Sequence, residues 1–214
     1  DLLDQNKKVL LEGAQGTLLD IDHGSYPFVT SSSPTIGGAC TGLGLDPHVI
    51  AGVLGVFKAY STRVGGGPMP SELDNSTGEE IRGKAHEFGT TTGRARRVGW
   101  FDAVAGKYSR MVNGFTGMVL TRLDILDGFS SVKICVGYEA DGNTIDRFPS
   151  NTGLLERCTP IWEEHPGWDQ PTASATEMTQ LPENALKYVR RIEELVGCPV
   201  QIISTGPSRA ETVL

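Results

Sequence analysis

Hydrophobic and polar residues follow one another in short blocks that are typical of an α/β protein. Segments of strand length predict four strands, at 9–12, 56–64, 118–123 and 199–204, and those at 9–12 and 118–123 are mainly apolar. Each run ends in glycine or small polar residues, which is where α/β sheets place their ligands. The dipeptide Asp141-Gly142, flanked by the segments 132–138 and 144–148, predicts a β-hairpin.

Helices are predicted from apolar spacing and from cap residues. The clearest spans 182–196, with Gly197 as its C-terminal stop. Apolar residues at helical spacing predict another helix over 100–112. Asp46-Pro47 predicts a short helix to about Leu54, and the capping-box spacing from Thr77 to Glu80 predicts a helix to about Phe88.

Strands that alternate with helices favour an α/β fold with a largely parallel sheet flanked by helices. The length of 214 residues allows a single domain over 1–214. We expect segments 30–44 and 153–176 to be irregular, because they are rich in small polar residues or proline. The chain begins and ends in mid-pattern, so we expect a domain that is incomplete at its N-terminus.

Charge and cysteine content narrow the class of protein. With 19 basic against 26 acidic residues the net charge is −7, which disfavours non-specific nucleic-acid binding. No apolar run approaches the ~18 residues that a membrane span needs. The four cysteines form no C-x-x-C pair, so we expect buried thiols in a reducing compartment, and a cytoplasmic location.

A basic segment is the first candidate for chemistry. Arg94, Arg96 and Arg97 follow Thr90, Thr91, Thr92 and Gly93. Hydroxyls, free backbone N–H groups and forked guanidinium groups together suit a carboxylate or a phosphate. A solvated basic loop is the alternative, and the hydroxyl-glycine prefix favours an anion site.

The end of the strand at 118–123 is the second candidate. Thr121-Arg122-Leu123-Asp124 resembles the guanine-reading motif of GTPases, in which a carboxylate accepts hydrogen bonds from N1–H and the 2-amino group. Arg122 departs from the usual lysine, although a guanidinium can stack on a base. The alternative is that Asp124 caps a loop.

Two further groups lie where strands end. Gln15 can hold a purine carbonyl or a phosphate, or it can serve only a turn. Ser204, Thr205 and Gly206 offer hydroxyl and backbone contacts, or they cap a turn. The four histidines share no spacing that suits a metal ion, and we expect no metal site in these residues.

Five segments in order along the chain resemble adenylosuccinate synthetases. They are LLEGAQGTLLDIDHGSYPFVTSS (10–32), KAYSTRVGGGP (58–68), EFGTTTGRARRVGW (87–100), TRLDILDG (121–128) and IISTGPSRAET (202–212). The resemblance covers nearly the whole chain and matches the C-terminal half of the family's chain. It implies a P-loop-NTPase-like family fold and the GTP-dependent joining of L-aspartate to IMP through a 6-phosphoryl-IMP intermediate.

The resemblance also implies roles for the candidate residues. Gln15, Thr30 and Arg94 would bind IMP. The segment Thr90, Thr91, Thr92, Gly93, Arg94, Ala95 and Arg96 would bind aspartate. The GTP site would comprise Arg96, Arg122, Leu123, Asp124, Ser204, Thr205 and Gly206.

One part of the family pattern has no counterpart in this sequence. The glycine-rich phosphate loop, with the family's catalytic Asp and His, is absent, so we expect no catalytic residue here and Mg²⁺ ligands elsewhere. We therefore expect the chain alone to be inactive and the family's homodimer to be its natural state. The alternative is a non-catalytic guanine-nucleotide-binding module or a split subunit.

Overall fold

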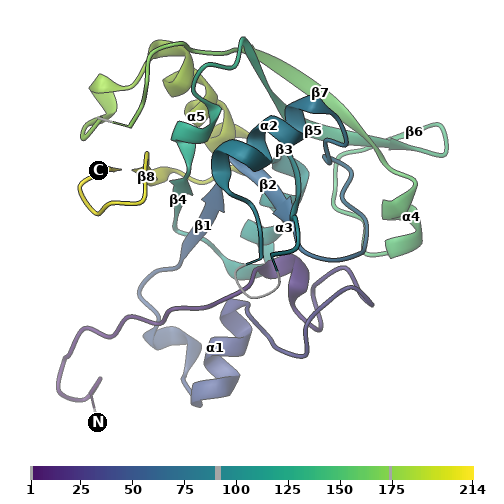
Figure 1. Cartoon of the computed structure of the whole chain (residues 1–214). Coiled ribbons are helices and arrows are strands. Elements are labelled where there is room, and N and C mark those ends of the chain that lie inside the picture. The colour runs from purple at the N-terminus through teal and green to yellow at the C-terminus, as the bar shows by residue number, and fades with distance from the viewer. Residues whose placement is uncertain (1, 90–92, 174) are drawn as a thin grey trace.

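The computed structural model describes residues 2–89, 93–173 and 175–214, and strands in this part of the chain form two sheets. The first sheet has the order β1-β4-β8-β9 (Figure 1). Its strands β1 (Leu54–Lys58), β4 (Gly117–Thr121) and β8 (Val200–Ser204) are parallel. The short β9 (Thr212–Val213) pairs antiparallel to β8.

The second sheet is mixed. Its β3 (Arg97–Asp102) and β5 (Ser131–Ala140) are parallel neighbours, and β2 (Tyr60–Arg63) pairs antiparallel to β3. β6 (Asn143–Ile145) and β7 (Thr159–Pro166) both pair antiparallel to β5. The α/β fold with parallel strands flanked by helices is confirmed, and these antiparallel pairs add to it.

Five α-helices occur in the described residues: α1 (Ile36–Leu43), α2 (Ser76–Ala85), α3 (Ala103–Asn113), α4 (Thr152–Glu156) and α5 (Glu183–Val196). The prediction of α5 is confirmed, and Gly197 ends it in the left-handed conformation at φ 73°. Short 3-10 helices lie at η1 (Thr17–Leu19), η2 (Pro47–Val49), η3 (Leu123–Leu126) and η4 (Met178–Gln180).

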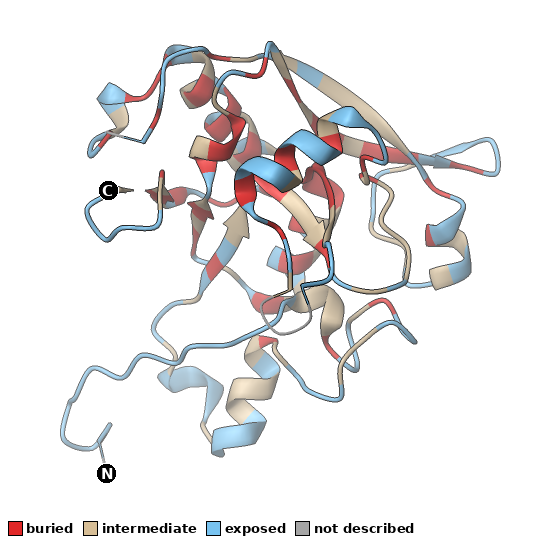
Figure 2. Ribbon diagram, in the orientation of Figure 1, coloured by how far each residue is buried: buried red, intermediate tan, exposed pale blue. Residues whose placement is uncertain are grey.

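The hydrophobic core lies between the strands and helices α2, α3 and α5, as the buried residues in Figure 2 show. Tyr188 of α5 is fully buried, and its hydroxyl donates a hydrogen bond to the Ala59 carbonyl at 2.8 Å. Ala59 separates β1 from β2, so this bond fixes the point where the chain passes between the sheets. The four cysteines are free thiols, and three of them are buried.

The strand predicted at 9–12 is wrong. This segment has no regular structure, and Leu10 is 89% exposed. An apolar run becomes a buried strand only where a sheet accepts it, and no described strand pairs with these residues. Figure 2 shows the same exposure along the N-terminal stretch.

Other strand and loop predictions need correction. The strand predicted at 56–64 is two strands, because the chain leaves β1 at Ala59 and enters the other sheet as β2. The segment 30–44 contains α1, and 153–176 contains α4 and β7. Helix α1 was not predicted because its sequence is rich in small residues. Strand β7 was not predicted because it contains prolines at 160 and 166, which are tolerated in a strand that pairs along one side only.

Helix starts also differ from the prediction. Trp100 and Phe101 belong to β3, and α3 begins at Ala103, with the Asp102 carboxylate accepting from the Ala105 N–H at 3.0 Å. The helix predicted from Asp46 is limited to η2. Helix α2 is capped by Asn75, not Thr77.

The predicted hairpin is confirmed at β5–β6. Asp141 and Gly142 have φ values of 52° and 77°, which suit a tight two-residue turn. The second strand ends at Ile145, earlier than predicted.

Candidate functional site

The parallel strands of the first sheet bring three candidate segments to one edge. In the β1–β4 register Lys58 lies opposite Thr121, and in the β4–β8 register Leu120 lies opposite Ile203. The carboxyl ends of β1, β4 and β8 therefore lie side by side (Figure 1). The chain leaves these ends as Arg122–Asp124 and Ser204–Gly206, at the edge where open α/β sheets bind ligands.

Asp124 presents an unpartnered acceptor at this edge. Arg122 turns the chain in the left-handed conformation at φ 60°, and the fully buried Leu123 begins η3. The Oδ1 atom of Asp124 is buried and has no hydrogen-bond partner. Burial, with further repulsion from the Asp127 and Glu211 carboxylates, raises the pKa of Asp124. A residue that only caps a turn would be expected to use its acceptor locally.

The second guanine-site segment forms a tight turn between β8 and β9. The Ser204 hydroxyl donates to the Gly206 carbonyl at 2.9 Å, and the Thr205 N–H donates to the Glu211 carbonyl at 3.0 Å. A Cβ at residue 206 would meet the Glu211 carboxylate, which would have to move aside. η3 packs against β8, which brings this turn to the side of Asp124.

The described residues on the two sides of the basic segment are joined by main-chain hydrogen bonds. The Arg96 N–H donates to the Glu87 carbonyl at 2.9 Å, and the Gly89 N–H donates to the Arg94 carbonyl at 2.8 Å. Gly93, Arg94 and Ala95 are exposed. Thr90, Thr91 and Thr92 lie outside the described residues.

The three arginines of the basic segment point to different partners. Arg96 donates from Nη1 to the Glu87 carboxylate at 2.8 Å. Arg97 forms a two-pronged ion pair with Glu72 and donates to the Gly67 carbonyl at 2.7 Å. The side chains of Arg96 and Arg97 therefore do not converge on one point: Arg97, the first residue of β3, faces Glu72, whereas Arg96 faces Glu87.

Glu87 was missed from sequence and is the most buried carboxylate near the loop. It is 1% exposed and accepts from Lys58 Nζ at 2.6 Å, Tyr60 Oη at 2.7 Å and Arg96 Nη1 at 2.8 Å. Burial opposes its ionisation, but the hydrogen bonds from Lys58 and Tyr60 and the nearby positive charges hold the pKa of Glu87 below its ordinary value. A glutamate next to a glycine-rich loop gave no sign of this role.

Gln15 and Thr30, predicted to bind IMP, are brought together through Ser32. The Ser32 hydroxyl contacts Gln15 Oε1 at 2.7 Å and the Thr30 hydroxyl at 2.9 Å. Gln15 is exposed and has a φ of 70°. Buried Arg63, also missed from sequence, donates to Ser25 Oγ and to the Phe28 carbonyl, both at 3.0 Å, and so ties this segment to the end of β2.

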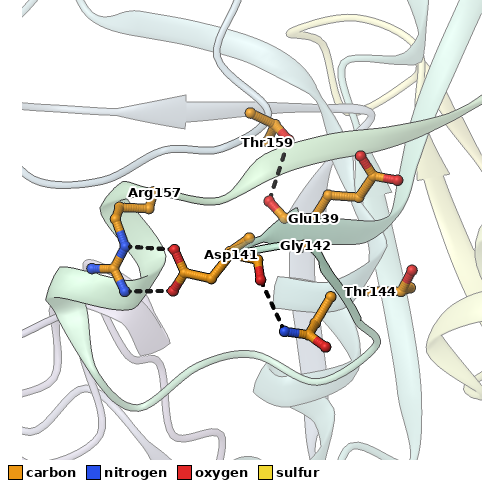
Figure 3. Close-up of a pocket in the computed structure, with 8 residues that line it drawn as sticks. Glu139, Asp141, Gly142, Thr144, Arg157 and Thr159 are labelled. Carbon is orange, nitrogen blue, oxygen red and sulfur yellow. Dashed lines mark hydrogen bonds and ion pairs between the residues drawn. The ribbon is translucent and has the colours of Figure 1, made fainter.

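Polar hollows also lie away from the residues predicted to bind guanine and IMP. One lies at the β5–β6 turn, where Arg157 forms a two-pronged pair with Asp141 (Figure 3). In the described part of the chain no three His, Cys, Asp or Glu side chains are grouped so that they could hold a metal ion. No helix there is long and apolar enough to cross a membrane.

Comparison with known proteins identifies the family. The family model of adenylosuccinate synthetase matches residues 1–213. The chain belongs to the adenylosuccinate synthetase family. Adenylosuccinate synthetases of Dehalococcoides mccartyi and Carboxydothermus hydrogenoformans are 53% and 52% identical to it, over all of this chain and 50% of each relative.

Solved structures agree with this assignment. The fully ligated adenylosuccinate synthetase of Plasmodium falciparum superposes with a TM-score of 0.96 at 40% identity, over all of this chain and 51% of that one. A succinoaminodeoxyadenylate synthetase of cyanophage S-2L shares the fold, with a TM-score of 0.53 at 18% identity. The chain thus spans about half the length of the curated relatives it matches.

Proposed function

We propose that this chain is the part of a GTP-dependent ligase that reads guanine and binds aspartate and IMP, in the synthesis of adenylosuccinate. The observation that carries the proposal is the buried, unpartnered Oδ1 of Asp124 at the shared edge of β4 and β8. The Oδ1 atom of Asp124 has no N–H donor in this chain, and the hydrogen-bonding edge of guanine would supply one. Membership of the family supports the same substrate.

The predicted residues divide into three groups under this proposal. Gln15, Thr30 and Arg94 bind IMP, and residues 90–96 bind aspartate. Arg96, Arg122, Leu123 and Asp124 bind GTP together with the turn at Ser204, Thr205 and Gly206. The contact between Arg122 Nη1 and the Ala85 carbonyl, at 2.7 Å, supports this division because it joins the guanine segment to the end of α2, the helix that precedes the aspartate loop.

We assign proton transfer and Mg²⁺ binding to a part of the protein outside this chain. The glycine-rich phosphate loop and the catalytic Asp and His that the resemblance associates with these roles have no counterpart in this sequence. The residues of this chain bind and orient the substrates. A homodimer in the cytoplasm completes the proposal, in keeping with the family.

The decisive experiment exchanges the acceptor of Asp124 for a donor. In the full-length protein that carries this chain, Asp124→Asn places an amide N–H₂ opposite the 2-amino group of guanine. At about 1.5–3 kcal/mol for a charged hydrogen bond, kcat/KM for GTP should fall about 10- to 100-fold. Xanthosine triphosphate carries a carbonyl at that position, so its kcat/KM should rise.

Asp127→Asn is the matched control. Asp127 lies next to the same 3-10 helix, but its carboxylate accepts from Trp168 Nε1 at 2.6 Å and from the Thr172 N–H at 2.7 Å. This variant should lose stability without exchanging its base preference. Equal losses for both nucleotides in Asp124→Asn would refute guanine reading by Asp124, and GTP binding without ligation would favour a non-catalytic module.

A further inference from the structure

The two ends of the predicted aspartate loop are joined twice. The Arg96 N–H donates to the Glu87 carbonyl, and the Arg96 guanidinium donates to the Glu87 carboxylate. The Arg96 carbonyl in turn accepts from Arg82 Nε at 2.9 Å. The described residues beside this base, 88–89 and 93–95, are therefore attached to a point that is fixed by main-chain and side-chain bonds.

The Glu87 carboxylate also fixes this base to both sheets. Its Oε1 accepts from Lys58, at the end of β1, and from Tyr60, at the start of β2. Its Oε2 accepts from Arg96. The Nε atom of Arg96 is buried and has no hydrogen-bond partner, so one N–H of the guanidinium is unpaired while Nη1 is bound to Glu87.

We propose that Glu87 is a positioning residue for ligation, which sets the direction of Arg96 and the spacing of the two ends of the aspartate loop. The inference rests on the proposed function, because it assigns the loop to aspartate. Glu87 touches no substrate in this proposal. It acts through Arg96, whose unpartnered donor it holds at the sheet edge.

The substitution Glu87→Gln tests this role selectively. Two donors, Lys58 and Tyr60, face Oε1, so a glutamine would turn its single carbonyl oxygen towards them. Its N–H₂ group would then face Arg96 Nη1, which is also a donor. The variant thus removes the Arg96 bond and keeps the other two.

Steady-state kinetics of the full-length protein provide the measurement. Loss of a charged hydrogen bond predicts that Glu87→Gln raises KM for L-aspartate at least about tenfold, while KM for IMP changes less than about twofold. The effect should vanish in an Arg96→Ala background, because Glu87 acts through that side chain. If Glu87 only stabilised the fold, Glu87→Gln would still raise KM for aspartate in the Arg96→Ala background.

The neighbouring pair supplies a matched control. Glu72→Gln breaks the Arg97 ion pair one residue further along the chain and should leave KM for aspartate unchanged. Tyr60→Phe removes one donor from Glu87 but keeps its bond to Arg96, so it too should leave KM for aspartate unchanged. If Glu87→Gln does not fold, Glu87→Asp keeps the charge but is one methylene shorter, and it should also raise KM for aspartate.

Hydrogen exchange separates failure of this inference from failure of the proposed function. In Glu87→Gln the amides of Gly89 and Arg96 should exchange about tenfold faster, and in Glu72→Gln they should not. A wild-type protein that forms no adenylosuccinate refutes the proposed function, and the exchange data still decide the role of Glu87. A folded Glu87→Gln protein with wild-type exchange at both amides, or with an unchanged KM for aspartate, overturns the inference.

Discussion

Buried Asp102 should make the protein less stable as the pH rises. Its carboxylate caps α3 through the Ala105 N–H and accepts from the Tyr138 hydroxyl at 2.8 and 2.9 Å. Burial raises the pKa of Asp102 from 3.8 to about 6, because the hydrogen bonds do not offset the cost of a charge in the core. The folded state therefore holds this proton more tightly than the unfolded state.

The sign and size of the effect follow from linkage. A raised pKa in the folded state contributes stability that is fully present below the unfolded value of 3.8 and is lost as the pH rises through about 6. The difference between these two pKa values corresponds to about 3 kcal/mol. Asp102→Asn mimics the protonated acid at every pH, since its amide can both accept from Ala105 and donate to Tyr138.

Urea unfolding of wild type and Asp102→Asn between pH 4 and pH 8 measures this contribution. The free energy of unfolding of the variant, relative to wild type, should increase by about 3 kcal/mol across that range. Asp146→Asn, which removes an exposed carboxyl, should follow the wild-type curve. Parallel curves for wild type and Asp102→Asn would refute the assignment of this titration to Asp102.

Two further predictions concern the substrates. Arg94→Leu in the full-length protein should impair aspartate use most, because loss of a charged hydrogen-bond partner costs about 1.5–3 kcal/mol. Unchanged KM for aspartate together with unchanged kcat would contradict the assignment of Arg94 to aspartate. The 214-residue chain alone should form no adenylosuccinate from IMP, GTP, aspartate and Mg²⁺, because general acid-base catalysis and metal assistance each accelerate such a reaction about 10²-fold or more. Product above the buffer background would contradict this prediction.

The pattern of apolar residues in the sequence predicted helix α5 and strand β4. Helix α5 was predicted nearly to the residue because its apolar face repeats over four turns and Gly197 stops it. Strand β4 was predicted because a buried parallel strand is an uninterrupted apolar run. The break at Ala59 was not predicted, because residues of high β propensity such as Tyr60 and Thr62 follow β1 directly and the segment resembles one strand.

Charged contacts between distant segments could not be predicted in the same way. The sequence grouped Arg94, Arg96 and Arg97 because they are neighbours, but Arg96 pairs with Glu87 and Arg97 with Glu72, which come from different parts of the chain. Nothing in the local pattern distinguishes these two glutamates from the exposed Glu79 and Glu80 of α2. The contacts of Glu87 and Glu72 depend on how far each side chain is buried, and burial is set by the folded structure and not by the local sequence.

Backbone strain gives a signal of function that local patterns lack. Among the described residues five non-glycine positions have a positive φ, and three of them, Gln15, His86 and Arg122, lie in or directly beside the candidate site. Such conformations carry a cost of about 1 kcal/mol or more unless the surroundings require them. At Arg122 the reversal turns the chain from β4 into η3, which buries Leu123 and holds Asp124 at the sheet edge. At His86 it ends α2 and directs Glu87 into the core. A residue chosen for its conformation alone would be glycine or asparagine, so a side chain kept at such a position points to a contact that the side chain itself makes. Arg122 makes one to Ala85.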